Sequence, residues 1–215
     1  MNINPDELRR RTLAYYQEKL AEHGATPLGV DWNGSENQSL QFAQLLKLLP
    51  EEGEFSINDF GCGYGALVEA LQARWPTMRY RGNDLNPDMI AAARQHHADH
   101  KTITFDIAER PLHSADYGVA SGVFTLRHGR SDAQCFSDMQ DLLDALHATS
   151  QIGFAFNTLT SYSDADRMRD YLYYPDPCML FDLCKRRYAR DVALLHDYGL
   201  YACTLLVRKT KTDSL

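Results

Sequence analysis

The chain has 215 residues, of which 44% are hydrophobic, and carries a formal net charge of −7 at pH 7. This length fits one domain with at most a small appendage, and the hydrophobic fraction suffices for a full core. The negative charge argues against tight, sequence-independent binding of nucleic acid. The chain has no apolar run that could span a membrane, no signal peptide and five dispersed cysteines without a C-x-x-C pair, so we expect a cytoplasmic protein with reduced thiols and no membrane contact.

Two helices are predicted before the first strand. Asn4 and Pro5 are typical of the N-cap and the first position of a helix, which we expect to end at Gly24. After a turn-like segment at residues 30–38, a second helix is predicted over Leu40–Leu49 because its apolar residues recur at helical spacing.

An apolar run at residues 55–60 ends in a glycine-rich turn at residues 61–65 and continues as a helix predicted from Leu67. Strand, glycine turn and helix open a nucleotide-binding βαβ unit. Glycines permit positive φ angles and let backbone amides contact a ligand, and helix amides beyond the turn can hold polar groups. The spacing is G-x-G-x-G rather than G-x-G-x-x-G, and the turn alone leaves a dinucleotide-binding domain or a turn without a ligand open.

Asp84 ends a predicted second strand, roughly twenty residues after the turn, where an acidic side chain commonly binds ribose hydroxyls. A helix is predicted next, from Met89 to about His97. His96 and His100 lie one helical turn apart at its end, but no third ligand accompanies them. We therefore predict no metal site.

Three more parallel strands are predicted at residues 103–106, 116–124 and 152–157, with a helix at 132–148 before the last. The run at 116–124 is almost wholly apolar, as expected for a strand buried on both faces.

The last part of the chain has a tyrosine- and proline-rich stretch at residues 171–177. A short helix is predicted from Ser163 into this stretch, and another at 178–188 after it. Two runs at 192–196 and 201–208, joined by a turn, predict a β-hairpin.

Two polar residues follow predicted strands at the edge where α/β sheets bind ligands. His128 follows the fourth strand and is a candidate general base, since an ordinary histidine pKa suits proton transfer near neutrality; a solvated loop histidine is the alternative. Asn157 ends the fifth strand and can orient a substrate through its donor and its acceptor; a capping residue is the alternative.

The stretch DFGCGYG at residues 59–65, followed by YRGNDL at residues 80–85, resembles the first two motifs of the class I S-adenosylmethionine (SAM)-dependent methyltransferases. The resemblance extends from about Leu40 to Lys209. It implies a three-layer, Rossmann-like α/β fold with a seven-stranded, mainly parallel sheet and an antiparallel last strand. It also implies an N-terminal helical lid, residues 1–50, before a methyltransferase domain, residues 51–215.

The same resemblance implies SAM as cofactor and S-adenosylhomocysteine as product. In this family the glycine turn contacts the amino-acid part and sugar of SAM, the acid after the second strand holds the ribose, and neighbouring residues bind the adenine. The residues that this assigns to the cofactor are Asp59, Gly61, Cys62, Gly63, Gly65, Asp84, Leu85, Met89, Asp106, Ile107 and Ser121.

The expected reaction is transfer of the sulfonium methyl to an O, N, S or C atom of a small metabolite. Residues 121–124 read SGVF and lack the N/D-P-P-Y-like motif of enzymes that methylate nucleic-acid bases or protein glutamine. A lid and the tyrosine-rich insertion favour a small substrate. The catalytic candidates are His128, Asn157 and Tyr16. The substrate-binding candidates are Tyr15, Trp32, Tyr173 and Tyr174. For Tyr15, Tyr16 and Trp32 the alternative is packing of the helices, and for the tyrosines of residues 171–177 it is cation–π contact with the charged sulfonium.

Two other functions stay open at this point. One is an enzyme that transfers or cyclises the aminobutyrate arm of SAM and releases methylthioadenosine. The other is a SAM-binding module without catalysis. The methyl acceptor, its reacting atom and the oligomeric state, monomer or homodimer, do not follow from the sequence.

Overall fold

The computed structural model describes residues 4–210, so the ends of the predicted lid and of the predicted domain lie outside the described residues. The strands are β1 (Ser56–Phe60), β2 (Arg79–Asp84), β3 (Ile103–Ile107), β4 (Ala115–Ala120), β5 (Ser150–Leu159), β6 (Asp191–Leu195) and β7 (Ala202–Arg208). The helices are α1 (Pro5–His23), α2 (Ser35–Leu45), α3 (Leu67–Gln72), α4 (Pro87–His96), α5 (Asp132–Thr149) and α6 (Pro177–Arg187). Two short 3₁₀ turns are η1 (Leu28–Val30) and η2 (Leu46–Leu48).

The seven strands form one sheet in the order β3-β2-β1-β4-β5-β7-β6. Strands β1 to β5 pair in parallel, whereas β7 runs antiparallel to both β5 and β6. The predicted fold, including the closing hairpin, is confirmed. The order reverses between β1 and β4, and ligands of open α/β sheets bind outside the carboxyl ends of the strands at such a reversal.

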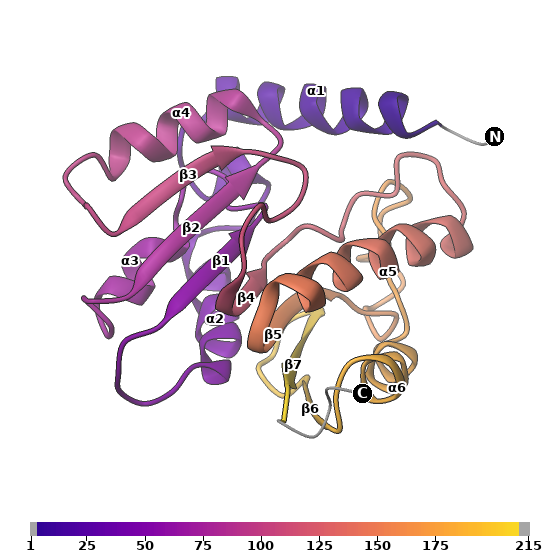
Figure 1. The fold of residues 1–215 in the computed structure, drawn as a ribbon. Helices are drawn as coiled ribbons and strands as arrows, with labels where there is room; N and C mark the ends of the chain where they lie inside the picture. Colours follow the sequence, from indigo (N-terminus) through magenta and orange to yellow (C-terminus); the bar gives the residue numbers. More distant parts are fainter. Residues whose placement is uncertain (1–3, 211–215) are drawn as a thin grey trace.

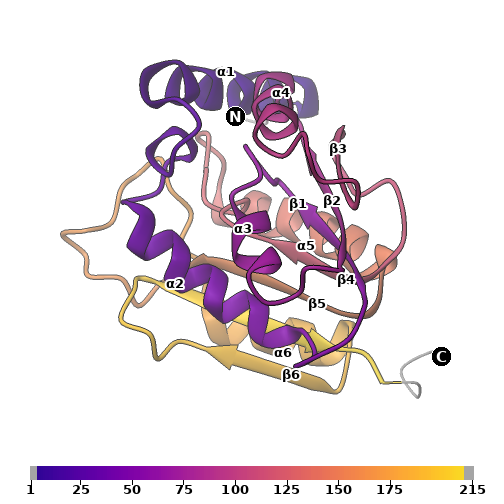
Figure 2. The same cartoon turned by 90° about the vertical axis from the view of Figure 1, so that its left-hand side faces the viewer.

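Helices cover both faces of the sheet, which gives three layers (Figure 1). One apolar core joins the sheet to α2, α3 and α4, with Leu45 and Ile57 fully buried in it. A second core joins the sheet to α5 and α6 and includes Phe154 and Leu143, also fully buried. Figure 2 shows α2 and α3 on the side of the sheet opposite α5.

Helix α1 differs from the other long helices because none of its residues is buried. It lies beside α4, across the carboxyl ends of the strands (Figures 1 and 2). Polar contacts attach it: the Tyr15 hydroxyl donates to Asp31 (2.6 Å), the Lys19 ammonium lies 3.0 Å from the same carboxylate, and Gln17 donates to Asp88 (3.2 Å). By contrast, Phe42 and Leu45 anchor α2 in the core.

Helix starts depend on capping groups, and one of the predicted starts is wrong. Helix α1 begins as predicted, with the Asn4 side chain accepting from the Glu7 N–H (2.8 Å). Helix α2 begins at Ser35 rather than Leu40, directly after Gly34 at φ 109°. Its first turn is polar, so apolar periodicity did not reveal it.

The short helix predicted from Ser163 is also wrong, because residues 161–176 form turns and irregular backbone. Both the N–H and the hydroxyl of Ser163 donate to the Thr160 carbonyl (3.0 and 2.7 Å). Serine and aspartate often satisfy nearby backbone groups in this way and compete with helix formation. Within residues 4–210, no helix has the length and apolarity needed to cross a membrane.

Candidate active site

A cavity of about 480 Å³ lies at the carboxyl ends of β1, β2 and β4, under α1. Its position is the reversal of strand order between β1 and β4. Its volume falls within the roughly 300–1,000 Å³ of small-molecule sites. The glycine turn, Asp84 and His128 all line this one space.

The glycine turn has a backbone that only glycine adopts easily. Gly61 and Gly63 have φ angles of 70° and 54°. A Cβ on Gly61 would lie 2.6 Å from Cγ2 of Val123. The Asn83 carbonyl at the end of β2 accepts from the N–H groups of Gly61 (2.8 Å) and Cys62 (3.1 Å), which fixes the turn against the sheet.

The carboxylate of Asp84 accepts two hydrogen bonds from the backbone and can accept further ones. Its Oδ2 accepts from the Gly63 N–H (2.9 Å) and its Oδ1 from the Asn86 N–H (2.8 Å). A carboxylate has about four acceptor sites, so it can also accept from the hydroxyls of a ribose. Burial raises the pKa of Asp84, and the hydrogen bonds from Asn86 and Gly63 oppose this shift.

Asp59 is a second acid on the cavity wall, with 2% of its surface exposed. Its Oδ2 accepts from the Tyr80 hydroxyl (2.6 Å). Burial raises the pKa of Asp59 to about 7; the Tyr80 hydrogen bond opposes the shift and the nearby Asp84 charge adds to it. Two buried carboxyls in one cavity favour a ligand that carries positive charge.

Near Asp84 the cavity wall includes the apolar side chains of Leu85, Met89 and Ala108. These features match the chemical parts of SAM. The apolar side chains suit the flat adenine base, Asp84 can accept from the ribose hydroxyls, and the two acids suit the positively charged groups. Gly61 and Gly63 line the cavity without side chains, so a ligand can approach the backbone of the turn. The residues present therefore fit SAM.

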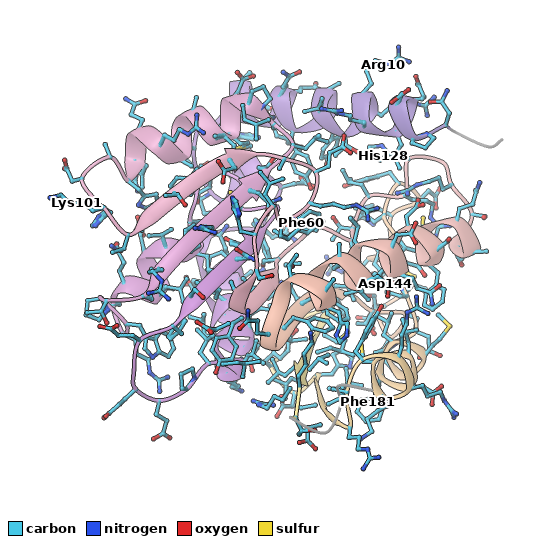
Figure 3. The ribbon with its side chains drawn as sticks, viewed as in Figure 1. Arg10, Phe60, Lys101, His128, Asp144 and Phe181 are labelled. Carbon is cyan, nitrogen blue, oxygen red and sulfur yellow. The ribbon has the colours of Figure 1, made fainter. Side chains whose placement is uncertain are left out.

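The loop between β4 and α5 presents His128 to the same cavity, beneath α1 (Figure 3). His128 has a φ of 51°, a conformation uncommon for residues other than glycine. The loop is held firmly: the Arg127 N–H donates to the Tyr171 carbonyl (2.9 Å), and the Arg130 guanidinium donates to the carbonyls of Leu126 (2.8 Å) and Arg127 (2.9 Å).

His128 stays neutral near pH 7. Burial lowers its pKa below the usual 6.5, and the positive charges of Arg130 and Arg11 lower it further. Its Nε2 lies 3.1 Å from the hydroxyl oxygen of Thr12 on α1. A neutral imidazole on a cavity wall has one nitrogen that can accept a proton.

Tyr16 and Trp32 cover the cavity from the N-terminal segment. Loss of contact with water in the cavity wall raises the pKa of the half-buried Tyr16, with Asp31 and Asp84 adding to the shift, so its hydroxyl stays protonated and can act as a hydrogen-bond donor. Trp32 lies against Gly122, where φ is 72° and a Cβ would come within 3.3 Å of the indole.

Asn157 supports the end of β4 from behind the cavity wall. Its Oδ1 accepts from the Gly122 N–H (2.8 Å), and its Nδ2 donates to the Ser121 hydroxyl (3.0 Å). The side chain is buried, with 1% exposed, and does not line the cavity. It acts on the site through Ser121 and Gly122, both of which line it.

A family model described as a methyltransferase domain matches residues 57–145. The protein named "Putative methyltransferase Rv1506c", of Mycobacterium tuberculosis, is 51% identical over 164 residues, which cover 76% of this chain and 99% of that relative. The chain belongs to the class I SAM-dependent methyltransferases. It is a methyltransferase, and its cofactor is SAM.

Other similar proteins agree with this family. The trans-aconitate 2-methyltransferase of Escherichia coli (strain K12 / DH10B) is 36% identical over 93 residues, which span 40% of this chain and 37% of that enzyme. The N-methyltransferase NodS of Bradyrhizobium japonicum WM9, solved with S-adenosylhomocysteine, has a TM-score of 0.67 at 17% identity and covers 93% of this chain and 99% of its own. The complex of DhpI with SAM also has a TM-score of 0.67, at 14% identity, covering 96% and 100%. At these identities the two solved structures support the fold.

Most residues predicted for the methyltransferase site lie together on the cavity wall. Those from the cofactor set are Asp59, Gly61, Cys62, Gly63, Asp84, Leu85, Met89 and Ser121. Those from the catalytic and substrate sets are Tyr16, His128, Trp32 and Tyr173. Their binding and catalytic roles stay predictions.

The remaining predicted residues lie off the wall: Gly65, Asp106, Ile107, Asn157, Tyr15 and Tyr174. The Gly65 carbonyl accepts from the ring of His97 (3.0 Å), and Tyr15 donates to Asp31. The Tyr174 hydroxyl accepts from the Arg169 N–H (3.1 Å), and Ile107 is 53% exposed. Their predicted roles would need contacts beyond this cavity.

Several wall residues were not predicted from the sequence. Pro5, Leu8 and Thr12 share one face of α1 with the predicted Tyr16, and their spacing of three or four residues is a signal that could have revealed this face. Another group comes from α5 and its preceding loop: Leu126, Arg130, Cys135, Asp138, Met139, Asp141 and Leu142. The apolar members of this group follow the same periodicity as core residues, so the sequence does not distinguish the two roles.

Proposed function

We propose that this methyltransferase transfers the SAM methyl group to a small molecule held between α1, the β4–α5 loop and α5. One observation carries the proposal: a single cavity is lined both by a nucleotide-type site, the glycine turn with Asp84, and by a neutral histidine, His128. SAM supplies a methyl group on positively charged sulfur and leaves as S-adenosylhomocysteine.

Within this proposal, the chain's residues bind the two reactants side by side. Asp84 accepts from the ribose hydroxyls, Leu85 and Met89 pack on the adenine, and the turn with Asp59 holds the amino-acid part. Much of the rate in such a transfer comes from aligning two reactants in a space from which water is excluded. Helix α1 and Trp32 supply the cover.

We assign His128 the role of general base for acceptors whose nucleophile carries a proton, such as a hydroxyl or an ammonium group. Its lowered pKa supports this role because the ring is unprotonated near pH 7. Tyr16 is assigned a hydrogen bond to the acceptor, and Asn157 is assigned to positioning Ser121 and Gly122.

The acceptor space favours a small, partly apolar molecule. Its wall combines apolar and aromatic side chains with charged ones from α5 and the loop before it: Phe124, Leu126, Met139, Leu142, Tyr173, Arg130, Asp138 and Asp141. A net charge of −7 supports a metabolite rather than nucleic acid as acceptor. The free thiols of all five cysteines support a reducing, cytoplasmic compartment.

We propose that the lid is the segment Pro5–Val30 rather than residues 1–50. Helix α1 has no buried residue and its inner face lines the cavity, whereas α2 is part of the core under the sheet. The lid then joins the rest of the domain near Trp32.

Calorimetric titration with SAM and S-adenosylhomocysteine tests the cofactor site. Asp84→Ala removes charged hydrogen bonds to the ribose, so we expect a loss on the order of 2–3 kcal/mol, which is tens-fold or more in affinity. Asp99→Ala, an exposed acid away from the cavity, serves as the control and should bind as the wild type does. If the wild type binds neither ligand, the proposal fails.

Product analysis by mass spectrometry then tests the reaction. Methyl transfer releases S-adenosylhomocysteine, whereas chemistry on the aminobutyrate arm releases methylthioadenosine. Detection of methylthioadenosine as the enzymatic product would replace methyl transfer with that chemistry.

A further inference from the structure

Helix α1 contributes more than a cover, because one of its side chains contacts the candidate base. The hydroxyl oxygen of Thr12 lies 3.1 Å from Nε2 of His128, and both residues line the cavity. They are 116 positions apart in the chain, so this contact exists only when α1 lies across the site.

The direction of this hydrogen bond follows from the single hydrogen of the threonine hydroxyl. The Thr12 hydroxyl lies 3.0 Å from the Leu8 carbonyl, and a carbonyl oxygen can only accept, so the hydroxyl donates there. Towards His128, the Thr12 oxygen then has only lone pairs. Nε2 must therefore carry the hydrogen, and in a neutral ring the bare lone pair is on Nδ1.

The remaining contacts of His128 leave Nδ1 available. Within residues 4–210, no hydrogen bond to this atom is present, although the ring lies on the cavity wall. The hydrogen bonds of Arg127 and Arg130 hold the loop backbone in its left-handed conformation at His128 and Gly129, which fixes where the side chain of His128 starts. Strained backbone of this kind persists only where its surroundings over-determine it.

We propose that Thr12 is a positioning residue that holds His128 in the Nε2–H tautomer, so that Nδ1 accepts the proton of the methyl acceptor. This inference rests on the proposed function, in which His128 is the general base. As the acceptor's nucleophilic atom bonds to the methyl carbon, the carbon–sulfur bond breaks with its electron pair remaining on sulfur. The acceptor's proton passes to Nδ1, and the resulting imidazolium keeps its Nε2–H bond to Thr12.

This arrangement couples coverage of the cavity to proton transfer. Helix α1 has no buried residue, so its position depends on side-chain contacts at its surface. With α1 displaced, His128 loses the acceptor that selects its tautomer. The fraction of His128 rings with an unprotonated Nδ1 is therefore higher in the covered site, where water is excluded.

Nitrogen-15 NMR of the histidine rings tests the inference without a known acceptor. The protein is labelled with nitrogen-15 and saturated with S-adenosylhomocysteine. It has eight histidines, so the signals of His128 are assigned as the ones that disappear in His128→Gln. Thr12→Ser keeps the hydroxyl, and Thr12→Val removes it while keeping a β-branched side chain of similar helix propensity.

We expect the wild type and Thr12→Ser to show a protonated Nε2 and an unprotonated Nδ1. Thr12→Val should lower the ratio of this tautomer to the other by about fivefold, the effect of losing a hydrogen bond of ordinary strength. A wild-type ring with the hydrogen on Nδ1, or an unchanged ratio in Thr12→Val, would overturn the inference. Either result leaves SAM binding and product analysis unaffected, so it is distinct from a failure of the proposed function.

Discussion

Two glycines with nearly equal φ angles allow the backbone strain caused by a side chain to be distinguished from its steric overlap with neighbours. Gly61 and Gly199 have φ angles of 70° and 72°, but a Cβ on Gly61 would lie 2.6 Å from Val123, while one on Gly199 would meet nothing within 4 Å. We expect Gly199→Ala to lower the free energy of unfolding by about 1 kcal/mol through backbone strain. Gly61→Ala should lower it by about 2–4 kcal/mol, because overpacking adds to the strain. Urea unfolding of both variants measures the difference, and equal losses would mean that Val123 moves aside.

At the residue scale, the sequence predicts features that depend on local spacing. The glycine turn and Asp84 follow from a motif and from the distance between two strands, and both line the cavity as the motif requires. The target of Asn157 does not follow from the sequence, since its contacts with Ser121 and Gly122 depend on the neighbouring strand β4. Thr12 carries no motif at all, and only the packing of α1 brings it to His128.

At the element scale, the helices differ in how firmly they are held. Helix α5 buries Cys135, Met139, Leu143 and Leu146, whereas α1 buries no residue. Segments with few buried apolar contacts open at low free energy. We expect amide hydrogen exchange in α1 to be at least about tenfold faster than in α5 and to slow when S-adenosylhomocysteine binds. Exchange in α1 that is as slow as in α5, with and without the ligand, would rule out α1 as a separately opening lid.

The errors in predicting elements have a common physical source. Apolar periodicity reveals strands and helices that bury a regular face, and it predicted the parallel strands and the terminal hairpin. It failed where polar groups decide the conformation, at the start of α2 after Gly34 and in the loop at Ser163. In both places, hydrogen bonds and backbone freedom outweigh side-chain burial.

At the scale of the whole molecule, the cavity results from elements that are distant in the sequence. The half proposed for the cofactor is lined by residues at the ends of β1 and β2, and the half proposed for the acceptor by α1, the β4–α5 loop and α5. The sequence predicts the first half because one βαβ unit forms it. The second half requires the helices to be docked on the sheet, so its wall of Leu126, Met139 and Leu142 was recognised only in the structure.

The cavity acids also affect the stability of the whole domain. Asp59 has a folded-state pKa of about 7, above its ordinary value of 3.8, so the folded chain holds this proton more tightly than the unfolded chain. The stability that this proton contributes is complete below about pH 4 and is lost as the pH rises towards 7. Asp59→Asn removes the charge while its amide oxygen can still accept from Tyr80.

We therefore expect Asp59→Asn to gain stability relative to the wild type as the pH rises from about 4 to 7, by on the order of 2–4 kcal/mol without SAM, and to gain no more above that range. Thermal and urea unfolding across this pH range measure the gain, and Asp99→Asn, at an exposed site, should show none. Saturating SAM should shrink the gain, because its positive charge favours the ionised carboxylate of Asp59 and not the amide. If the difference in unfolding free energy between Asp59→Asn and the wild type does not change with pH, Asp59 is already ionised in the folded protein. Its raised pKa would then be wrong.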